Sequence, residues 1–185
     1  MSIEIRTLEV DGIEMREDDD GHHLVGTVVP WHSTYEMRPG VFERFTRGAF
    51  DKTLLERADK IPLLEQHARD RFQIGRSVSF TKTPDGLVAD FRLARTARGE
   101  EARALAADGL VTGLSVGFRP IRDRESRRDA GGRLVERLEV ALDHVGLVSS
   151  PAYADAVVTS VRAFDPDDPD VAPRLARARH LLDIG

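Results

Sequence analysis

The chain has 185 residues, of which 41% are hydrophobic and 32% are charged, and its formal net charge is −5. This length and composition predict one domain of moderate size with a packed core and a well-solvated surface. The absence of cysteine excludes disulfides, thiolate catalysis and sulfur-ligated metals, and the absence of a large cationic block argues against a nucleic-acid partner.

The first two thirds of the sequence predict mainly β-strands. Residues 4–10 and 24–31 are two of them, separated by an acidic turn at residues 17–21. A hairpin follows, in which Pro84-Asp85-Gly86 forms the turn. Its first strand is expected to present Ile74, Val78 and Phe80 on one face, and its return strand Leu87, Ala89, Phe91 and Leu93.

Two helices and a second long strand complete the expected domain. Helical spacing of apolar residues predicts helices over 48–58 and 99–107, and Gly109 is suited to end the second. Residues 122–132 are interpreted as a charged loop at a mobile hairpin tip, and residues 134–148 as a long, central strand.

The composition changes after Phe164, so the sequence predicts three parts. These are a domain over residues 1–164, an acidic, proline-rich linker over 165–173, and a short amphipathic helix over 174–185. The N-terminus carries no signal-peptide pattern, and no apolar run approaches the ~20 residues that span a bilayer. We therefore expect a soluble, cytoplasmic protein with no membrane partner.

The segment Gly113-Leu114-Ser115-Val116-Gly117-Phe118 carries the first chemical signal. On a strand, the apolar residues of this segment share one face, and Ser115 stands between two glycines on the other. Such a hydroxyl could act as a peptide-cleaving nucleophile, because another backbone can approach closely over glycine. The alternative is a half-buried strand whose small face packs beneath a helix.

A serine nucleophile needs a base, and histidine is the usual one near neutral pH. His67 ends an apolar, strand-like run, and His144 lies inside a segment that is otherwise built to be buried. His67 could instead cap backbone groups in a loop, and His144 could be a core histidine bonded to a carbonyl. The others are not candidates: His22, His23 and His180 are expected on the surface, and His32 has no evident role. The spacing of the histidines does not match a metal site.

Four motifs in sequence order resemble the prohead (capsid maturation) proteases of tailed bacteriophages, over roughly residues 26–161. They are RGAF at 47–50, LLEQH at 63–67, GLSVGF at 113–118 and VGLVSSPA at 145–152. The resemblance implies an α+β, mainly β fold: an antiparallel β-barrel, closed or nearly closed, flanked by a few helices as in the herpesvirus assemblins.

The resemblance also implies a catalytic triad. It places the nucleophile at Ser115, the base at His67 and the third member at His144, where many phage members carry an acidic residue and assemblins carry histidine. Asp143 is the alternative third member, since a β-bulge could turn it to the same face. The remaining expectations are oxyanion donors near Ser149 and Ser150 and a substrate-binding surface at Gly113 and Gly117.

By resemblance, the activity would be that of a serine endopeptidase without cofactor or metal. Its substrates would be the scaffold segment of the major capsid protein and the enzyme itself, inside the immature capsid in the host cytoplasm, and a homodimer is an open possibility. The helix over 174–185 would dock on the shell or scaffold and later be trimmed. Two alternatives are a catalytically inactive capsid assembly or scaffolding protein on the same fold, and a β-barrel binding module whose serine accommodates a ligand strand.

Overall fold

The computed structural model describes residues 4–8, 13–18, 21–31 and 33–149. The elements in chain order are β1 (Glu4–Leu8), β2 (Ile13–Asp18), β3 (Gly21–Pro30), β4 (Tyr35–Arg38), β5 (Val41–Phe45), α1 (Asp51–Arg57), β6 (Pro62–Glu65), β7 (Gly75–Lys82), β8 (Gly86–Leu93), α2 (Ala97–Ala107), β9 (Gly113–Arg127) and β10 (Arg133–Val148). The linker and tail helix expected after residue 164, together with His32, Ser150 and His180, lie outside the described residues.

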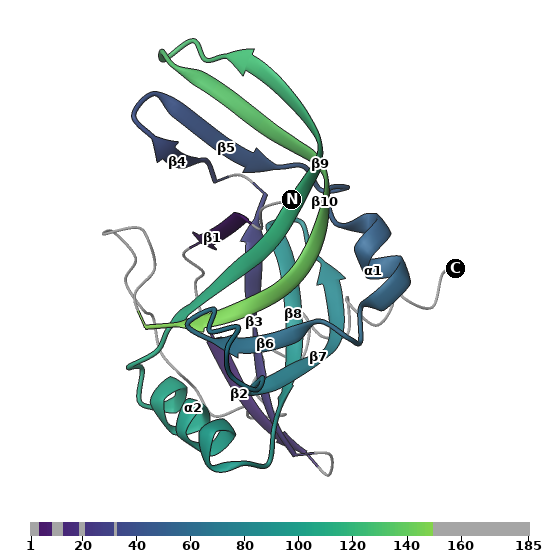
Figure 1. Cartoon of the computed structure of the whole chain (residues 1–185), viewed down its shortest axis with the longest axis vertical. Coiled ribbons are helices and arrows are strands. Elements are labelled where there is room, and N and C mark those ends of the chain that lie inside the picture. Colours follow the sequence, from purple (N-terminus) through teal and green to yellow (C-terminus); the bar gives the residue numbers. More distant parts are fainter. Residues whose placement is uncertain (1–3, 9–12, 19–20, 32, 150–185) are drawn as a thin grey trace.

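The strands form one sheet in the order β1-β9-β10-β6-β7-β8-β3-β2, with β5 pairing to β10 and β4 pairing to β5. The sheet curls into a half-barrel, and α1 and α2 lie on its outside (Figure 1). The predicted mainly β fold with a few helices is therefore confirmed. Most of the strand pairs are antiparallel, as expected, and β10 adds parallel pairs with both β5 and β6.

One face of β8 is buried, as the alternation of apolar residues predicts. Leu87, Ala89, Phe91 and Leu93 are all buried in the core. The prediction for the preceding strand is wrong at Val78, which is 44% exposed. The reason is an irregularity in the pairing between Ser77 and Ser79, which interrupts the alternation of faces and buries Ser77 instead.

Both predicted helices are present, with different bounds. α2 begins two residues earlier than expected, because the Thr96 side chain accepts a hydrogen bond from the Gly99 amide and caps the helix. Gly109 follows its end with a φ of +69°, as a C-terminal stop requires. α1 packs on β10, where the Thr53 hydroxyl donates to the Val140 carbonyl and accepts from the Leu142 amide.

The prediction of a charged loop over residues 122–132 is wrong. β9 continues to Arg127 and β10 begins at Arg133, so only five residues turn between them. The outer halves of these strands, with β4 and β5, form an arm that projects from the half-barrel (Figure 1). Charged residues are compatible with strands here because they pair across them: Glu136 on β10 accepts hydrogen bonds from Arg44 and Arg124 on the neighbouring strands.

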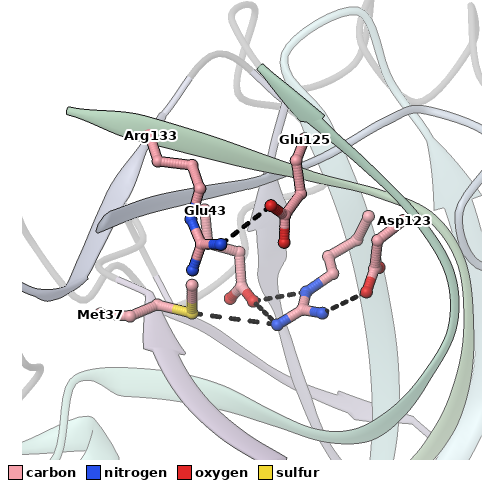
Figure 2. Close-up of polar contacts among 6 residues, drawn as sticks. Met37, Glu43, Asp123, Glu125 and Arg133 are labelled. Atoms are coloured by element: carbon pink, nitrogen blue, oxygen red, sulfur yellow. Dashed lines mark hydrogen bonds and ion pairs between the residues drawn. The ribbon is translucent and has the colours of Figure 1, made fainter. Parts of the chain in front are cut away.

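The other face of the arm holds a buried ion-pair network (Figure 2). The Arg137 guanidinium, 6% exposed, donates to Glu43 at 2.6 Å and to Asp123 at 2.7 Å, and it also contacts the Met37 sulfur. The Glu43 side chain is only 1% exposed. Buried charges of this kind persist only when they are paired, so the network fixes how β5, β9 and β10 meet.

One histidine assigned to the surface is not there. His23 on β3 is 2% exposed, and its Nδ1 lies 2.7 Å from a carboxylate oxygen of Asp90 on β8. The expectation of a solvated side chain is therefore wrong for His23. The reason is the start of the strand, which is expected at residue 24 but lies at Gly21, so that His23 is part of β3.

Candidate active site

Ser115 lies near the start of β9, with β10 beside it. The pairing register places Ser115 directly opposite Gly146, and Gly117 opposite His144. Directly opposed residues of an antiparallel pair point to the same face, with Cβ positions about 4.5–5.5 Å apart. Ser115, Gly117, His144 and Gly146 therefore form one small patch of a single sheet face.

His144 fills the space that Gly117 leaves open. A Cβ built on Gly117 would lie 2.5 Å from Nε2 and 2.7 Å from Nδ1 of the His144 ring. The ring therefore lies flat against the bare backbone of β9, and His144 is 0% exposed. The glycine that was expected to clear room for a substrate chain makes room here for an imidazole.

β6 brings His67 to the same patch from the other side of β10. β6 pairs in parallel with β10 through Val145, Gly146 and Leu147, and the Gln66 amide extends this pairing by donating to the Leu147 carbonyl. The chain then turns sharply, with the Ala68 amide donating to the Glu65 carbonyl at 2.7 Å. This turn directs the His67 side chain back over the strand it has just paired with.

The turn is conformationally strained. Gln66 has a φ of +47° and His67 a φ of +59°, and they are the only residues other than glycine with positive φ in the described part of the chain. Residues other than glycine rarely adopt this region, and among them asparagine, aspartate and histidine do so more often than glutamine. Strain of this kind concentrates at functional sites, where the surrounding structure holds it in place.

The two imidazoles meet over β10. His67 Nδ1 lies 2.7 Å from His144 Nε2, and the rings are 5.0 Å apart at their centroids, edge to face. The His67 ring also lies over Gly146, where a built Cβ would be 2.7 Å from the ring Cε1. Because Gly146 is the partner of Ser115 across the strands, the His67 ring covers the position next to Ser115 on the same sheet face.

The other nitrogen of His67 is left available. His67 Nε2 is buried and has no hydrogen-bond partner among the described residues. Burial of the ring, and the positive charge that His144 can carry, lower the pKa of His67 from an ordinary value of 6.5 to about 4. At neutral pH the ring is therefore neutral, so one of its nitrogens can accept a proton.

Comparison with known proteins gives a family match. The family model described as caudovirus prohead serine protease matches residues 11–168, which is most of the chain. The chain belongs to the caudovirus prohead serine protease family. A search of curated proteins gave no match.

The fold of this prohead protease has a solved relative. The capsid assembly protease gp21 of bacteriophage T4 superposes with a TM-score of 0.57 and 13% sequence identity, over 81% of this chain and 98% of that one. At this identity the likeness concerns the fold. The half-barrel with few helices is thus similar to the fold of that protease.

The residues expected around the oxyanion are only partly described. Ser149 is exposed, and its hydroxyl accepts a hydrogen bond from Gln66 Nε2 at 2.8 Å. It therefore lies next to the turn that carries His67, while Ser150 lies outside the described residues. The oxyanion role of this segment and a substrate-binding role for Gly113 and Gly117 stay predictions.

Sequence reasoning missed three residues that shape the site of this prohead protease. Gly146 had no assigned role, although its missing side chain leaves room for the His67 ring. Gln66 was not recognised as one of two strained turn residues. Arg69 was not considered, and its guanidinium bonds the Asp143 carboxylate at 3.0 Å. A glycine opposite the candidate serine, once the strand register is known, is the signal that could have identified Gly146.

Two absences complete the description. Within residues 4–8, 13–18, 21–31 and 33–149, no cluster of three or more potential ligands could hold a metal ion. In the same part of the chain, no helix has the length and apolar character needed to cross a membrane.

Proposed function

We propose that this prohead protease is an endopeptidase whose nucleophile is Ser115, whose general base is His67 and whose third member is His144. The observation that carries the proposal is the buried Nε2 of His67, which has no hydrogen-bond partner among the described residues, on a ring that lies over Gly146, the residue opposite Ser115. A buried polar atom without a partner is rare in folded proteins and calls for an explanation. One explanation is that Nε2 is the atom that takes the serine proton during the reaction and gains its partner only then.

The proposed chemistry follows the logic of serine hydrolases. His67 Nε2 takes the proton of the Ser115 hydroxyl as Oγ attacks the peptide carbonyl, and an acyl-enzyme forms when the amine leaves with that proton. His67 then activates a water molecule, which releases the acyl group. His144 Nε2 accepts a hydrogen bond from the Nδ1–H of His67 at 2.7 Å. This bond holds the His67 ring with its Nε2 unprotonated.

The proposed substrate is the scaffold segment of the major capsid protein, followed by the enzyme itself, inside the immature shell in the host cell. Membership of the prohead protease family supports capsid proteins as partners. The segment 165–173, whose acidic, proline-rich composition predicts a linker, is the proposed site of self-cleavage, because a protease cuts an unpacked segment more readily than a folded one. A homodimer stays a prediction.

One observation favours the inactive alternative, a capsid assembly protein on the same fold. Ser115 is 0% exposed in the free chain, so a substrate carbonyl reaches its Oγ only if neighbouring atoms move. In an inactive protein Ser115 can stay buried at all times, whereas an enzyme must expose the Ser115 hydroxyl when substrate binds. A measurement of cleavage therefore separates the two functions.

The experiment is co-expression with the major capsid protein encoded by the same phage. We expect the wild-type chain to shorten the capsid precursor, and Ser115→Ala and His67→Ala to leave it at full length while folding normally. Ser126→Ala, an exposed serine on the same strand, is the matched control and should process as the wild type does. Processing by Ser115→Ala would refute the proposal, and failure of the folded wild type to process would support the inactive alternative.

A further inference from the structure

Asp143 stands at an interruption of the β9–β10 ladder. Leu142 pairs with Phe118 and His144 pairs with Gly117, so the register skips Asp143. Two residues of β10 thus occupy the place of one, which is the pattern of a β-bulge, and a bulge re-aims side chains. On a regular strand Asp143 would point away from His144, but here its Oδ2 lies 3.1 Å from His144 Nδ1.

A second contact holds the carboxylate in place. Arg69, two residues after His67, donates from Nη2 to the same Oδ2 at 3.0 Å. The Asp143 side chain is 23% exposed and that of Arg69 is 54% exposed. Arg69 therefore ties the turn that carries His67 to the bulge that carries Asp143, and it keeps a positive charge beside the carboxylate.

We propose that Asp143 is a positioning residue at the start of a relay, in which hydrogen bonds run from Asp143 through His144 to His67, the proposed base for Ser115. This inference rests on the proposed function and extends it by one group. His144 and Asp143 are then not alternatives for one place in the triad. They act in series, the imidazole in contact with the base and the carboxylate behind it.

The relay fixes the tautomer of both rings. An ionised carboxylate only accepts hydrogen bonds, so His144 must carry its proton on Nδ1 to donate to Asp143. His144 Nε2 is then an acceptor, and it accepts from the Nδ1–H of His67. His67 is left with an unprotonated Nε2, which is the form that can take the proton of Ser115.

The relay also supplies a charge that the triad lacks. When the Ser115 O–H bond breaks, its proton binds to His67 Nε2, and the ring becomes a cation in a buried site. Burial opposes this charge, as the pKa of His67 near 4 indicates. His144 is neutral in the relay and cannot compensate it, whereas Asp143 places a negative charge behind His144.

The other charged groups near the site leave this role to Asp143. Arg69 is positive and bonds Asp143 itself. Glu65, at the end of β6, is 44% exposed and pairs with Arg71 and Arg98. Among the described residues, Asp143 is thus the carboxylate that contacts the imidazole pair.

The test compares Asp143→Asn with Asp70→Asn. Asp70 is an exposed acid in the segment that follows His67, so the control removes the same charge nearby without breaking the relay. Asparagine removes the negative charge, while its amide oxygen can still accept from Arg69 and from His144 Nδ1, so the variant isolates the charge of Asp143. We expect Asp143→Asn to slow cleavage of the purified capsid precursor at least 100-fold and to change its pH profile, and Asp70→Asn to match the wild type.

The second readout does not depend on cleavage. In ¹⁵N-histidine NMR spectra at pH 7, the wild type and Asp70→Asn should show protonated Nδ1 and unprotonated Nε2 on both His67 and His144. The opposite tautomers in the wild type, or an unchanged pH profile in Asp143→Asn, would overturn the relay. Cleavage by Ser115→Ala would instead overturn the proposed function, so the two failures are distinguishable.

Discussion

The His144 ring lies so close to Gly117 that no side chain fits between them. A Cβ on residue 117 would be 2.5 Å from His144 Nε2, the atom that bonds His67. Since His144 is fully buried, its ring cannot move aside without disturbing the core. The missing side chain of Gly117 therefore leaves the space that the ring of His144, the third member of the proposed triad, occupies.

Substitution of Gly117 tests whether the His144 ring needs this space. We expect Gly117→Ala to displace His144 and with it His67, and to slow cleavage about 100-fold, because small misplacements of catalytic groups have effects of that order. Gly48→Ala is the matched control, since its Cβ would meet only an Asp51 oxygen at an ordinary 3.8 Å. Cleavage is measured on folded protein, and a fully active Gly117→Ala would contradict the account.

Acid should destabilise the protein through His67. The pKa of His67 is about 4 in the folded chain and near 6.5 when unfolded, so between these values the unfolded state binds more protons than the folded state. Stability therefore rises with pH across this window and falls as pH drops from 7 towards 4. We expect the urea midpoint at pH 5 to lie below that at pH 7, and His67→Gln to weaken this dependence. An identical dependence in His67→Gln would show that other groups cause it.

The buried ion pairs of the arm should matter far more than exposed ones. Arg137→Met would leave the Glu43 carboxylate buried without its guanidinium, which typically costs about 3–5 kcal/mol of unfolding free energy. Arg133→Met removes an exposed pair with Glu125 in the same region (Figure 2), where a loss of at most about 1 kcal/mol is expected. Urea denaturation of both variants measures the difference, and equal losses would contradict the assignment.

The strained turn makes a separate prediction about Gln66. Gln66→Gly keeps the positive φ without steric conflict and should retain both stability and cleavage. Gln66→Val should lose both, because a β-branched residue at positive φ is a strong outlier. Ser149→Ala controls for the lost side-chain hydrogen bond, and full stability and cleavage in Gln66→Val would be inconsistent with this reasoning.

Some of this structure could be predicted because it depends on local patterns. The alternation at residues 87–93 identifies β8, and a threonine cap and a glycine stop bound α2. The charged arm could not be predicted, since its strands are stabilised by ion pairs such as Arg137 with Glu43, which are 94 residues apart. The burial of His23 depends in the same way on Asp90, which is 67 residues away in the sequence but lies on the neighbouring strand β8.

The candidate site also has a part that local patterns predict and a part that depends on contacts between distant segments. Ser115 and His67 could be proposed from motifs, because each lies in a short segment with its own pattern. The contact between His67 and His144 depends on β6 pairing in parallel with β10, which no local pattern reveals. The place of Asp143 depends on a bulge, a shift of one residue in the register that is visible only once both strands are paired.

The most direct measurement of the central claim is the site at which a small fluorophosphonate modifies the protein. A serine activated by a neighbouring base reacts with this reagent, and mass spectrometry locates the adduct. The account predicts one adduct, on Ser115, which is absent from His67→Gln. An adduct on another serine, equal labelling of His67→Gln, or no adduct at all would contradict it.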